Sequence, residues 1–162
     1  MSKPELRNLE NLPGGYRSDI EIYCARIWER YGSRFLGALL FGSLARGEAH
    51  PYETLESDID LIVLIDGLPP LSQRIVEKIE VEKNLHTLVR AVWMTPQDLE
   101  GHIKAKAGYV LDAFDEGILL YDRDGFLSES RRKLAEELEK KGVVKTDRWW
   151  SFPVKAGEEY TY

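Results

Sequence analysis

Two short apolar runs constrain the fold of this chain more than any other feature of its sequence. The first is "RFLGALLFG" (residues 34–42) and the second is "DIDLIVLID" (residues 58–66), which is apolar at consecutive positions once past its two initial acids. Both runs are too short for a buried helix. Strands that are apolar on both sides belong in a sheet that is covered on both faces. The chain is therefore expected to fold around a sheet with these two strands near its centre.

Segments with helical spacing alternate with the strands. Before the first strand, apolar residues recur at helical intervals up to Gly32, with Ser18 as the expected N-cap. A third strand is expected in residues 86–95, and a helix follows it with Thr95 as cap and Pro96 at its first position. Residues 109–117 and 126–142 are expected to be helical, with a short strand in residues 118–125. Strands that alternate with helices indicate an α/β or α+β fold.

The helix expected between the second and third strands is amphipathic. In residues 69–85, Leu71, Ile75 and Ile79 recur at helical intervals. We expect this helix to cover one face of the sheet with that apolar stripe.

The length of 162 residues is typical of one domain. We expect the domain to span residues 1–142, with its core motif region in residues 34–95, and a C-terminal tail to span residues 143–162. The tail is rich in aromatic residues and is expected to dock on the domain or to form a homo-oligomer contact; these residues are Trp149, Trp150, Phe152, Tyr160 and Tyr162.

Composition excludes several classes of protein. The net charge of −6 disfavours general binding to nucleic acid backbones. The single cysteine, Cys24, excludes an intramolecular disulfide framework and is expected to be a core thiol. No apolar run is long enough to span a bilayer, and the first residues lack the apolar segment of a secretory signal. The sequence therefore predicts a cytoplasmic protein without a membrane partner.

Two carboxylates break the apolar pattern at the start of the second strand. Asp58 and Asp60 are two residues apart, so on a strand they point to the same side. Such a pair shares a proton, pairs with a cation or binds a divalent metal, and Mg²⁺ or Mn²⁺ suits an oxygen-rich site. The alternative is a solvent-exposed pair that only begins the strand. If the two strands are antiparallel, the carboxylates lie beside Gly42 and Ser43, where a short helix begins and its N–H groups can receive a phosphate.

These residues resemble a known signature. "GSLARG" (residues 42–47) followed by "SDIDL" (residues 57–61) is similar to the motif of the polymerase-beta-type nucleotidyltransferase superfamily, in particular its minimal nucleotidyltransferase (MNT) branch. The resemblance implies a single-domain nucleotidyltransferase fold, an α/β (α+β) architecture with a mixed β-sheet flanked by helices.

The resemblance also implies an activity and roles for individual residues. A nucleoside monophosphate, AMP from ATP, would be transferred to an acceptor in a Mg²⁺-dependent (or Mn²⁺-dependent) reaction. Asp58 and Asp60 would be the metal ligands and catalytic residues, while Gly42, Ser43 and Arg46 would bind the nucleotide; Arg46 is alternatively a surface ion-pair partner of Glu48. The branch pairs with small helical HEPN proteins, so the expected acceptor is a HEPN-type toxin, with this chain as its antitoxin.

The sequence departs from the family pattern at the third carboxylate. Alignment on Thr95 and Pro96 places Val92 where family members carry an acid, and Arg90 is the nearest charged residue that shares its strand parity. The loop before Asp58 either lends Glu53 or Glu56 or is a solvated insertion. Without a third acid, two-metal catalysis is weakened or absent. The alternative function is therefore a catalytically weak or inactive member that binds nucleotide or a partner protein.

Overall fold

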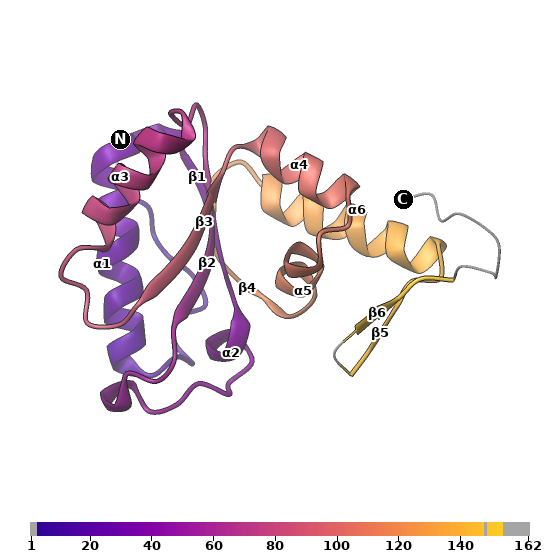
Figure 1. Ribbon diagram of the computed structural model, residues 1–162, viewed down its shortest axis with the longest axis horizontal. Coiled ribbons are helices and arrows are strands. Elements are labelled where there is room, and N and C mark those ends of the chain that lie inside the picture. Colours follow the sequence, from indigo (N-terminus) through magenta and orange to yellow (C-terminus); the bar gives the residue numbers. More distant parts are fainter. Residues whose placement is uncertain (1–2, 148, 154–162) are drawn as a thin grey trace.

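A four-stranded mixed sheet forms the centre of the protein (Figure 1). The computed structural model describes residues 3–147 and 149–153. The strands lie in the order β3-β2-β1-β4, and their bounds are β1 (Phe35–Phe41), β2 (Ile59–Ile65), β3 (Val89–Met94) and β4 (Ile118–Asp122). β1 is antiparallel to β2 and β4, whereas β2 and β3 are parallel. The two apolar runs thus occupy the two central strands, as predicted.

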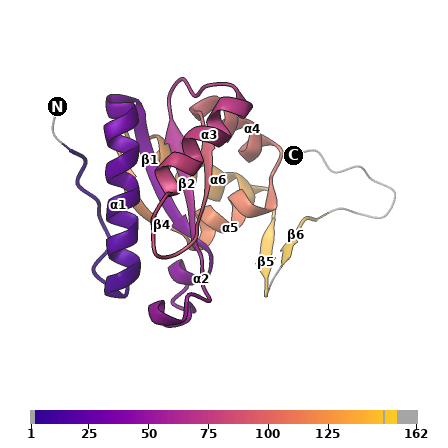
Figure 2. The ribbon, with the colours of Figure 1, turned by 60° about the vertical axis from the view of Figure 1, so that its left-hand side comes forward.

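Helices cover both faces of this sheet, as Figures 1 and 2 show. On one side lie α1 (Gly14–Tyr31) and α3 (Leu71–Glu82), and on the other lie α4 (Pro96–Lys104), α5 (Gly108–Glu116) and α6 (Phe126–Lys140). Each side has its own apolar core, because successive residues of β1 and β2 point to opposite faces. Short elements connect these parts: η1 (Gly32–Arg34), α2 (Gly42–Ala45) and η2 (Tyr52–Thr54). A mixed sheet flanked by helices is confirmed.

The predicted caps are right for one helix and wrong for another. Thr95 and Asp98 form a reciprocal capping box at the start of α4, as Thr95 followed by Pro96 indicates. Ser18, however, lies inside α1, which begins four residues earlier and has Pro13 at its N-cap position. Tertiary packing explains the difference: a side chain at Gly15 would collide with the ring of Tyr52, so the glycine lets this ring pack against the first turn of α1.

The amphipathic helix α3 faces the opposite way to the prediction. Its large apolar side chains point to solvent rather than to the sheet; their exposed fractions are Leu71 66%, Ile75 52%, Val76 59% and Ile79 62%. Val81 is its buried apolar residue. On the inner side, the Lys78 ammonium donates to the backbone oxygen of Ala91 in β3 at 2.5 Å. Helix α3 therefore presents the charged Lys78 side chain to the outer edge of β3 and leaves its apolar stripe exposed.

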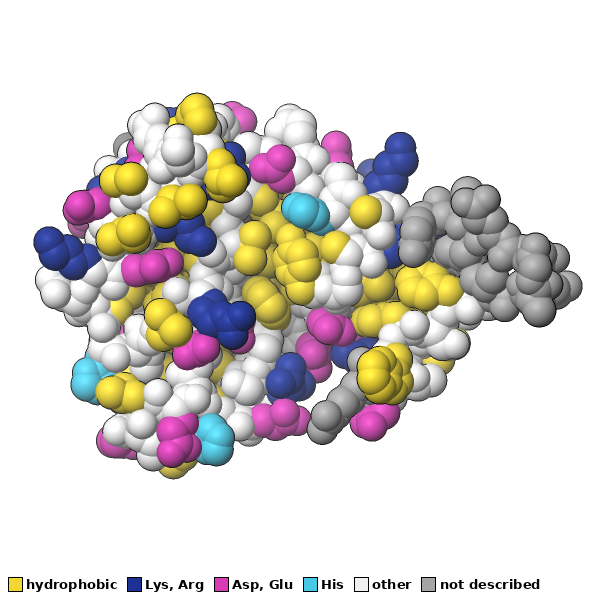
Figure 3. Space-filling view, viewed as in Figure 1, with side chains coloured by type: hydrophobic (Ala, Val, Ile, Leu, Met, Phe, Trp, Pro, Cys, Tyr) yellow, Lys and Arg dark blue, Asp and Glu magenta, His cyan; other side chains and the backbone are white. Residues whose placement is uncertain are grey.

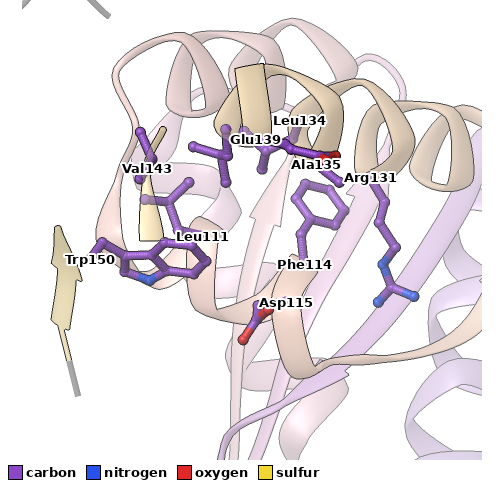
Figure 4. Close-up of a pocket in the computed structure, with 10 residues that line it drawn as sticks. Leu111, Phe114, Asp115, Arg131, Leu134, Ala135, Glu139, Val143 and Trp150 are labelled. Carbon is purple, nitrogen blue, oxygen red and sulfur yellow. The ribbon is translucent and has the colours of Figure 1, made fainter. Parts of the chain in front are cut away.

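A C-terminal hairpin contacts the side of the protein formed by α5 and α6. Its strands are β5 (Val144–Thr146) and β6 (Trp149–Ser151). Trp150 donates to the Asp112 carboxylate in α5 at 2.8 Å, whereas Trp149 is 71% exposed. A cavity of about 440 Å³ lies under the hairpin, and Figure 4 shows Trp150 next to Leu111 at one end of it and Arg131 at the other. Tyr160 and Tyr162 of the aromatic tail lie outside the described residues, and the division of the chain after residue 142 stays a prediction.

Two further findings concern predictions from composition. Cys24 is buried in the core between α1 and the sheet, and burial raises the pKa of its thiol to about 12. Across the described part of the chain, the helices are too short or too polar to cross a membrane.

The turn that leaves β1 is shaped by Gly42. Its φ of +76° lies in the left-handed region, which favours glycine. A Cβ atom at this position would lie 2.2 Å from Oδ2 of Asp60, which is far inside van der Waals contact. Absence of a side chain at Gly42 therefore allows the backbone to lie directly against the Asp60 carboxylate.

Alanine substitution tests this close approach. Gly47 offers a matched control, because its φ is +73° but a Cβ there would meet no atom within 4 Å. We expect Gly47→Ala to lower the free energy of unfolding by about 1–2 kcal/mol through backbone strain alone. Gly42→Ala should lose about 1–3 kcal/mol more, because the added methyl displaces Asp60. Urea unfolding at neutral pH measures both losses, and equal losses would contradict the close approach.

Candidate active site

The two aspartates lie beside the Gly42 turn. Asp60 is the second residue of β2 and pairs with Phe41, the last residue of antiparallel β1; Asp58 immediately precedes the strand. The Asp58 side chain is 33% exposed and the Asp60 side chain is 21% exposed. Asp60 shares the strand parity of Ile62, which belongs to the core on the side of α4, α5 and α6. The predicted meeting of the Gly42–Ser43 turn with the carboxylates is therefore confirmed as geometry.

The loop that leads into Asp58 is anchored by a buried carboxylate that sequence reasoning missed. Asp19 in α1 is 4% exposed and accepts hydrogen bonds from the hydroxyl of Tyr52 at 2.9 Å, the backbone N–H of Thr87 at 3.1 Å and the hydroxyl of Thr87 at 2.7 Å. The N–H of His50 donates to Oγ of Ser57 at 2.8 Å. These bonds tie the loop to α1 and to the segment before β3. No short-range sequence signal marks Asp19, because its partners are 33 and 68 residues away.

Neither glutamate of this loop joins the aspartates as a third carboxylate. Glu53 is exposed, and Glu56 is exposed with one oxygen 3.1 Å from Nδ1 of His50. Within residues 3–147 and 149–153, no group of three His, Cys, Asp or Glu side chains is arranged to hold a metal ion. The carboxylates at this turn are therefore Asp58 and Asp60, and a Mg²⁺ held by them would need its other ligands from water or a bound substrate.

An arginine faces both aspartates from the neighbouring strand. In the parallel register of β2 and β3, Asp60 pairs with Arg90 and Ile62 pairs with Val92. Nη1 of Arg90 lies 3.6 Å from Oδ2 of Asp58, and Nε lies 3.9 Å from Oδ1 of Asp60. Val92, the residue at the aligned acidic position, is 37% exposed and lies two residues further along β3. The position directly opposite Asp60 is thus occupied by a cation.

The remaining predicted residues lie on and just after α2. Ser43 follows Gly42 in the first turn and is half-buried. The Arg46 guanidinium pairs with Glu48 at 3.0 Å and with Glu116 of α5 at 3.3 Å. The expected ion pair with Glu48 is present, and Glu116 is a second partner that the sequence did not suggest.

Arg46 lines a polar cavity of about 420 Å³ next to this turn. Lys145 of the C-terminal hairpin reaches the same cavity, where its ammonium lies 3.3 Å from Asp112, 3.2 Å from Asp115 and 3.6 Å from Glu116. The hairpin thus supplies a cation to a cluster of acids on α5. The sequence separation of about thirty residues hides this contact from pattern analysis.

Burial and charge act against each other on Asp60. Burial raises the pKa of its carboxyl, the Arg90 guanidinium lowers it, and the Asp58 carboxylate raises it; the net pKa lies above the ordinary value. The folded protein therefore holds Asp60 charged at neutral pH at a net cost in stability. This cost appears as the pH rises from the ordinary aspartate pKa of about 3.9 through the raised pKa of the folded state.

Neutralising Asp60 should make this cost visible. We expect Asp60→Asn to be more stable than the wild type at pH 7, and its advantage to shrink as the pH falls towards about 4. Urea unfolding in EDTA at a series of pH values measures the difference. Asp122→Asn is the contrasting control, since the Asp122 carboxylate accepts three hydrogen bonds at the start of α6 and its loss should destabilise the protein. An Asp60→Asn protein less stable than the wild type at pH 7 would contradict the burial cost.

A solved toxin–antitoxin structure shares this fold. A toxin–antitoxin with AMP-PNP aligns with a TM-score of 0.50 at 19% sequence identity, covering 73% of this chain and 86% of that chain. A mutant of the toxin–antitoxin MntA-HpeT aligns with a TM-score of 0.49 at 16% sequence identity, covering 75% of this chain and 87% of that chain. A putative nucleotidyltransferase from Sulfolobus solfataricus aligns with a TM-score of 0.41 at 19% sequence identity, covering 72% of this chain and 95% of that chain.

Sequence comparisons decide the family. Curated proteins give no match to the chain. The family model "Polymerase beta, Nucleotidyltransferase" matches residues 25–126, which is more than half of the chain and contains both aspartates, the Gly42 turn and Arg90. The chain therefore belongs to the polymerase beta nucleotidyltransferase family.

Proposed function

We propose that this protein transfers AMP from ATP to a hydroxyl group of a protein acceptor, with Asp58 and Asp60 as ligands of one Mg²⁺ or Mn²⁺. The observation that carries the proposal is the contact between the Gly42 turn and Asp60, where a Cβ would lie 2.2 Å from the carboxylate. A phosphate chain at this turn would lie within reach of both carboxylates. Membership of a nucleotidyltransferase family supports the reaction class.

Each residue at the turn has a role that its chemistry allows. Gly42 lets the backbone approach the β- and γ-phosphates, and Ser43 donates its hydroxyl to them. Arg46 adds positive charge at the phosphates while Glu48 and Glu116 hold it. A divalent ion bound by Asp58 and Asp60 would neutralise charge on the triphosphate and on departing pyrophosphate.

The proposed transfer is a substitution at the α-phosphorus. The acceptor oxygen forms a bond to this phosphorus, the bond to the oxygen that bridges to the β-phosphate breaks, and pyrophosphate leaves. The hydroxyl proton passes to water, since no third carboxylate faces Asp58 and Asp60 in the described part of the chain. Such a site is expected to work slowly, because general base catalysis typically contributes a factor of about 10²–10⁴.

The surface of α3 supports a protein as the acceptor. This α3 surface consists of Leu71, Ile75, Val76 and Ile79, which are all more than half exposed. Figure 3 shows hydrophobic side chains gathered over the position that α3 occupies in Figure 1. Leu88, 61% exposed, lies two residues before Arg90 and brings exposed apolar surface next to the aspartates. An apolar surface of this kind marks a protein interaction site rather than a site for a small polar acceptor.

The resemblance to the MNT branch suggests a HEPN-type toxin as that acceptor, with this chain as its antitoxin. The structural similarity to a toxin–antitoxin with AMP-PNP is consistent with a nucleotide and a protein partner. ATP, Mg²⁺ and such a partner are all available in the cytoplasm, where we place the protein.

The alternative is a member that binds nucleotide without transferring it. Arg90 opposite Asp60, and a valine at the aligned acidic position, favour this alternative. Pyrophosphate release separates the two functions: a transferase releases it only with acceptor present, whereas a binding protein retains ATP unchanged.

The aspartates should be required for transfer. We expect Asp58→Ala and Asp60→Ala each to lower AMP labelling of a HEPN-type partner by at least about 10²-fold, because each removes one of two metal ligands. ATP labelled at the α-phosphate, followed by electrophoresis of the mixture, measures the transfer. Glu53→Ala is the matched control from the adjacent loop and should keep wild-type labelling. Labelling that persists in both aspartate variants would place the reaction elsewhere.

The α3 surface should be required for the protein acceptor but not for the nucleotide. We expect Ile79→Glu to weaken partner binding and partner labelling about tenfold or more, because a charge enters an apolar interface. Binding of AMP-PNP should stay at the wild-type level. Ile22→Glu, on α1 and 41% exposed, is the control for a charge introduced at another exposed isoleucine. Equal labelling by both variants would remove α3 from the acceptor interface.

A further inference from the structure

Arg90 is the positive charge closest to the centre of the candidate site. Its guanidinium spans both carboxylates, with N–O distances of 3.6 Å to Asp58 and 3.9 Å to Asp60. Arg46, by contrast, is already paired with Glu48 and Glu116. Arg90 is therefore the arginine that contacts both aspartates, and its charge acts on Asp60 more strongly than that of Arg46.

The contact is loose and its arginine is free to reorient. Both distances exceed the usual hydrogen-bond length of about 2.9 Å, and the Arg90 side chain is 67% exposed. A guanidinium stays charged at every physiological pH, and its planar donors match phosphate oxygens. A small movement from the carboxylates to a bound phosphate would keep this charge at the site.

Charge and geometry leave room for one divalent cation beside Arg90, not two. A second ion in a two-metal site needs further carboxylate ligands, and the position opposite Asp60 carries the Arg90 side chain instead. Two aspartates and one guanidinium give this cluster a formal charge of about −1. A single Mg²⁺ shared with the triphosphate suits that charge, whereas a second would lie against the guanidinium.

We propose that Arg90 takes the place of a second divalent cation, so that the nucleotide complex holds one divalent ion at Asp58 and Asp60 with Arg90 on the phosphates. The inference rests on the proposed function, because it assumes that nucleotide binds at the Gly42 turn. Without nucleotide, Arg90 competes with the metal ion for the same two carboxylates.

Counting bound ions tests the proposal without any measurement of transfer. Mn²⁺ is titrated into the protein with saturating AMP-PNP, and bound ions are counted by electron paramagnetic resonance. We expect one Mn²⁺ per wild-type complex and two per Arg90→Asp complex, because the variant introduces a third carboxylate at the position that pairs with Asp60. Two ions in the wild-type complex, or one in the variant, would overturn the proposal.

A second titration uses Mn²⁺ alone with the nucleotide-free protein. We expect Arg90→Ala to bind Mn²⁺ about two- to fivefold more tightly than the wild type, which corresponds to the loss of exposed ion pairs. Arg90→Lys should stay close to the wild type, and so should Arg30→Ala, the control at an exposed arginine on α1. Unchanged or weaker Mn²⁺ binding by Arg90→Ala would show that Arg90 does not compete with the metal ion for the two carboxylates.

The aspartate variants separate failure of this inference from failure of the proposed function. If Asp58→Ala and Asp60→Ala keep full Mn²⁺ and AMP-PNP binding, the proposed site is wrong and the inference falls with it. If they lose binding while the wild-type complex holds two ions, the proposed site stands and only the role of Arg90 is wrong. Thermal unfolding of each variant checks that it is folded. The Arg90 variants are expected to fold because the Arg90 side chain is 67% exposed.

Discussion

Antiparallel pairing of β1 with β2 is the interaction on which the candidate site depends. The register sets Phe41 opposite Asp60, so the chain leaves one central strand where the other begins. Both strands are buried on both faces, so a slip of one residue would exchange side chains between two cores that are each packed around one set. The hydrophobic core thus determines how the Gly42 turn lies against the carboxylates. Asp60 bears the electrostatic cost of that position.

Patterns within a few residues predicted most elements. Thr95 and Pro96 marked the start of α4, and the two continuous apolar runs identified the central strands. The meeting of Gly42, Ser43 and Asp60 was predictable as well, because antiparallel neighbours bring the end of one strand to the start of the next. These features could be predicted because each depends on residues that are near one another in the sequence.

Errors arose where distant contacts override local pattern. The local sequence indicates Ser18 as an N-cap, but α1 begins earlier, at Gly14. Its first turn packs against the Tyr52 ring, which Gly15 allows because it has no side chain. The strand parity of Arg90 could be read from the sequence. Its position opposite Asp60 depends on the register between β2 and β3. That register could not be predicted, because parallel strands are joined by a long crossover and not by a short turn that fixes the pairing. Asp19 carried no signal, since its three hydrogen bonds cross 33 and 68 residues.

Both outer edges of the sheet are occupied, and each is closed in a different way. Along β4, the N-terminal segment donates from the backbone of Arg7 and the side chain of Asn8 to strand carbonyls. Along β3, the Lys78 ammonium binds the carbonyl oxygen of Ala91, so the helix presents charge to an edge that would otherwise pair with another sheet. Because α3 turns its polar side towards the β3 edge, its apolar side faces solvent. Protection of the β3 edge and exposure of an apolar surface are therefore properties of opposite sides of the same helix, and the orientation of α3 sets both.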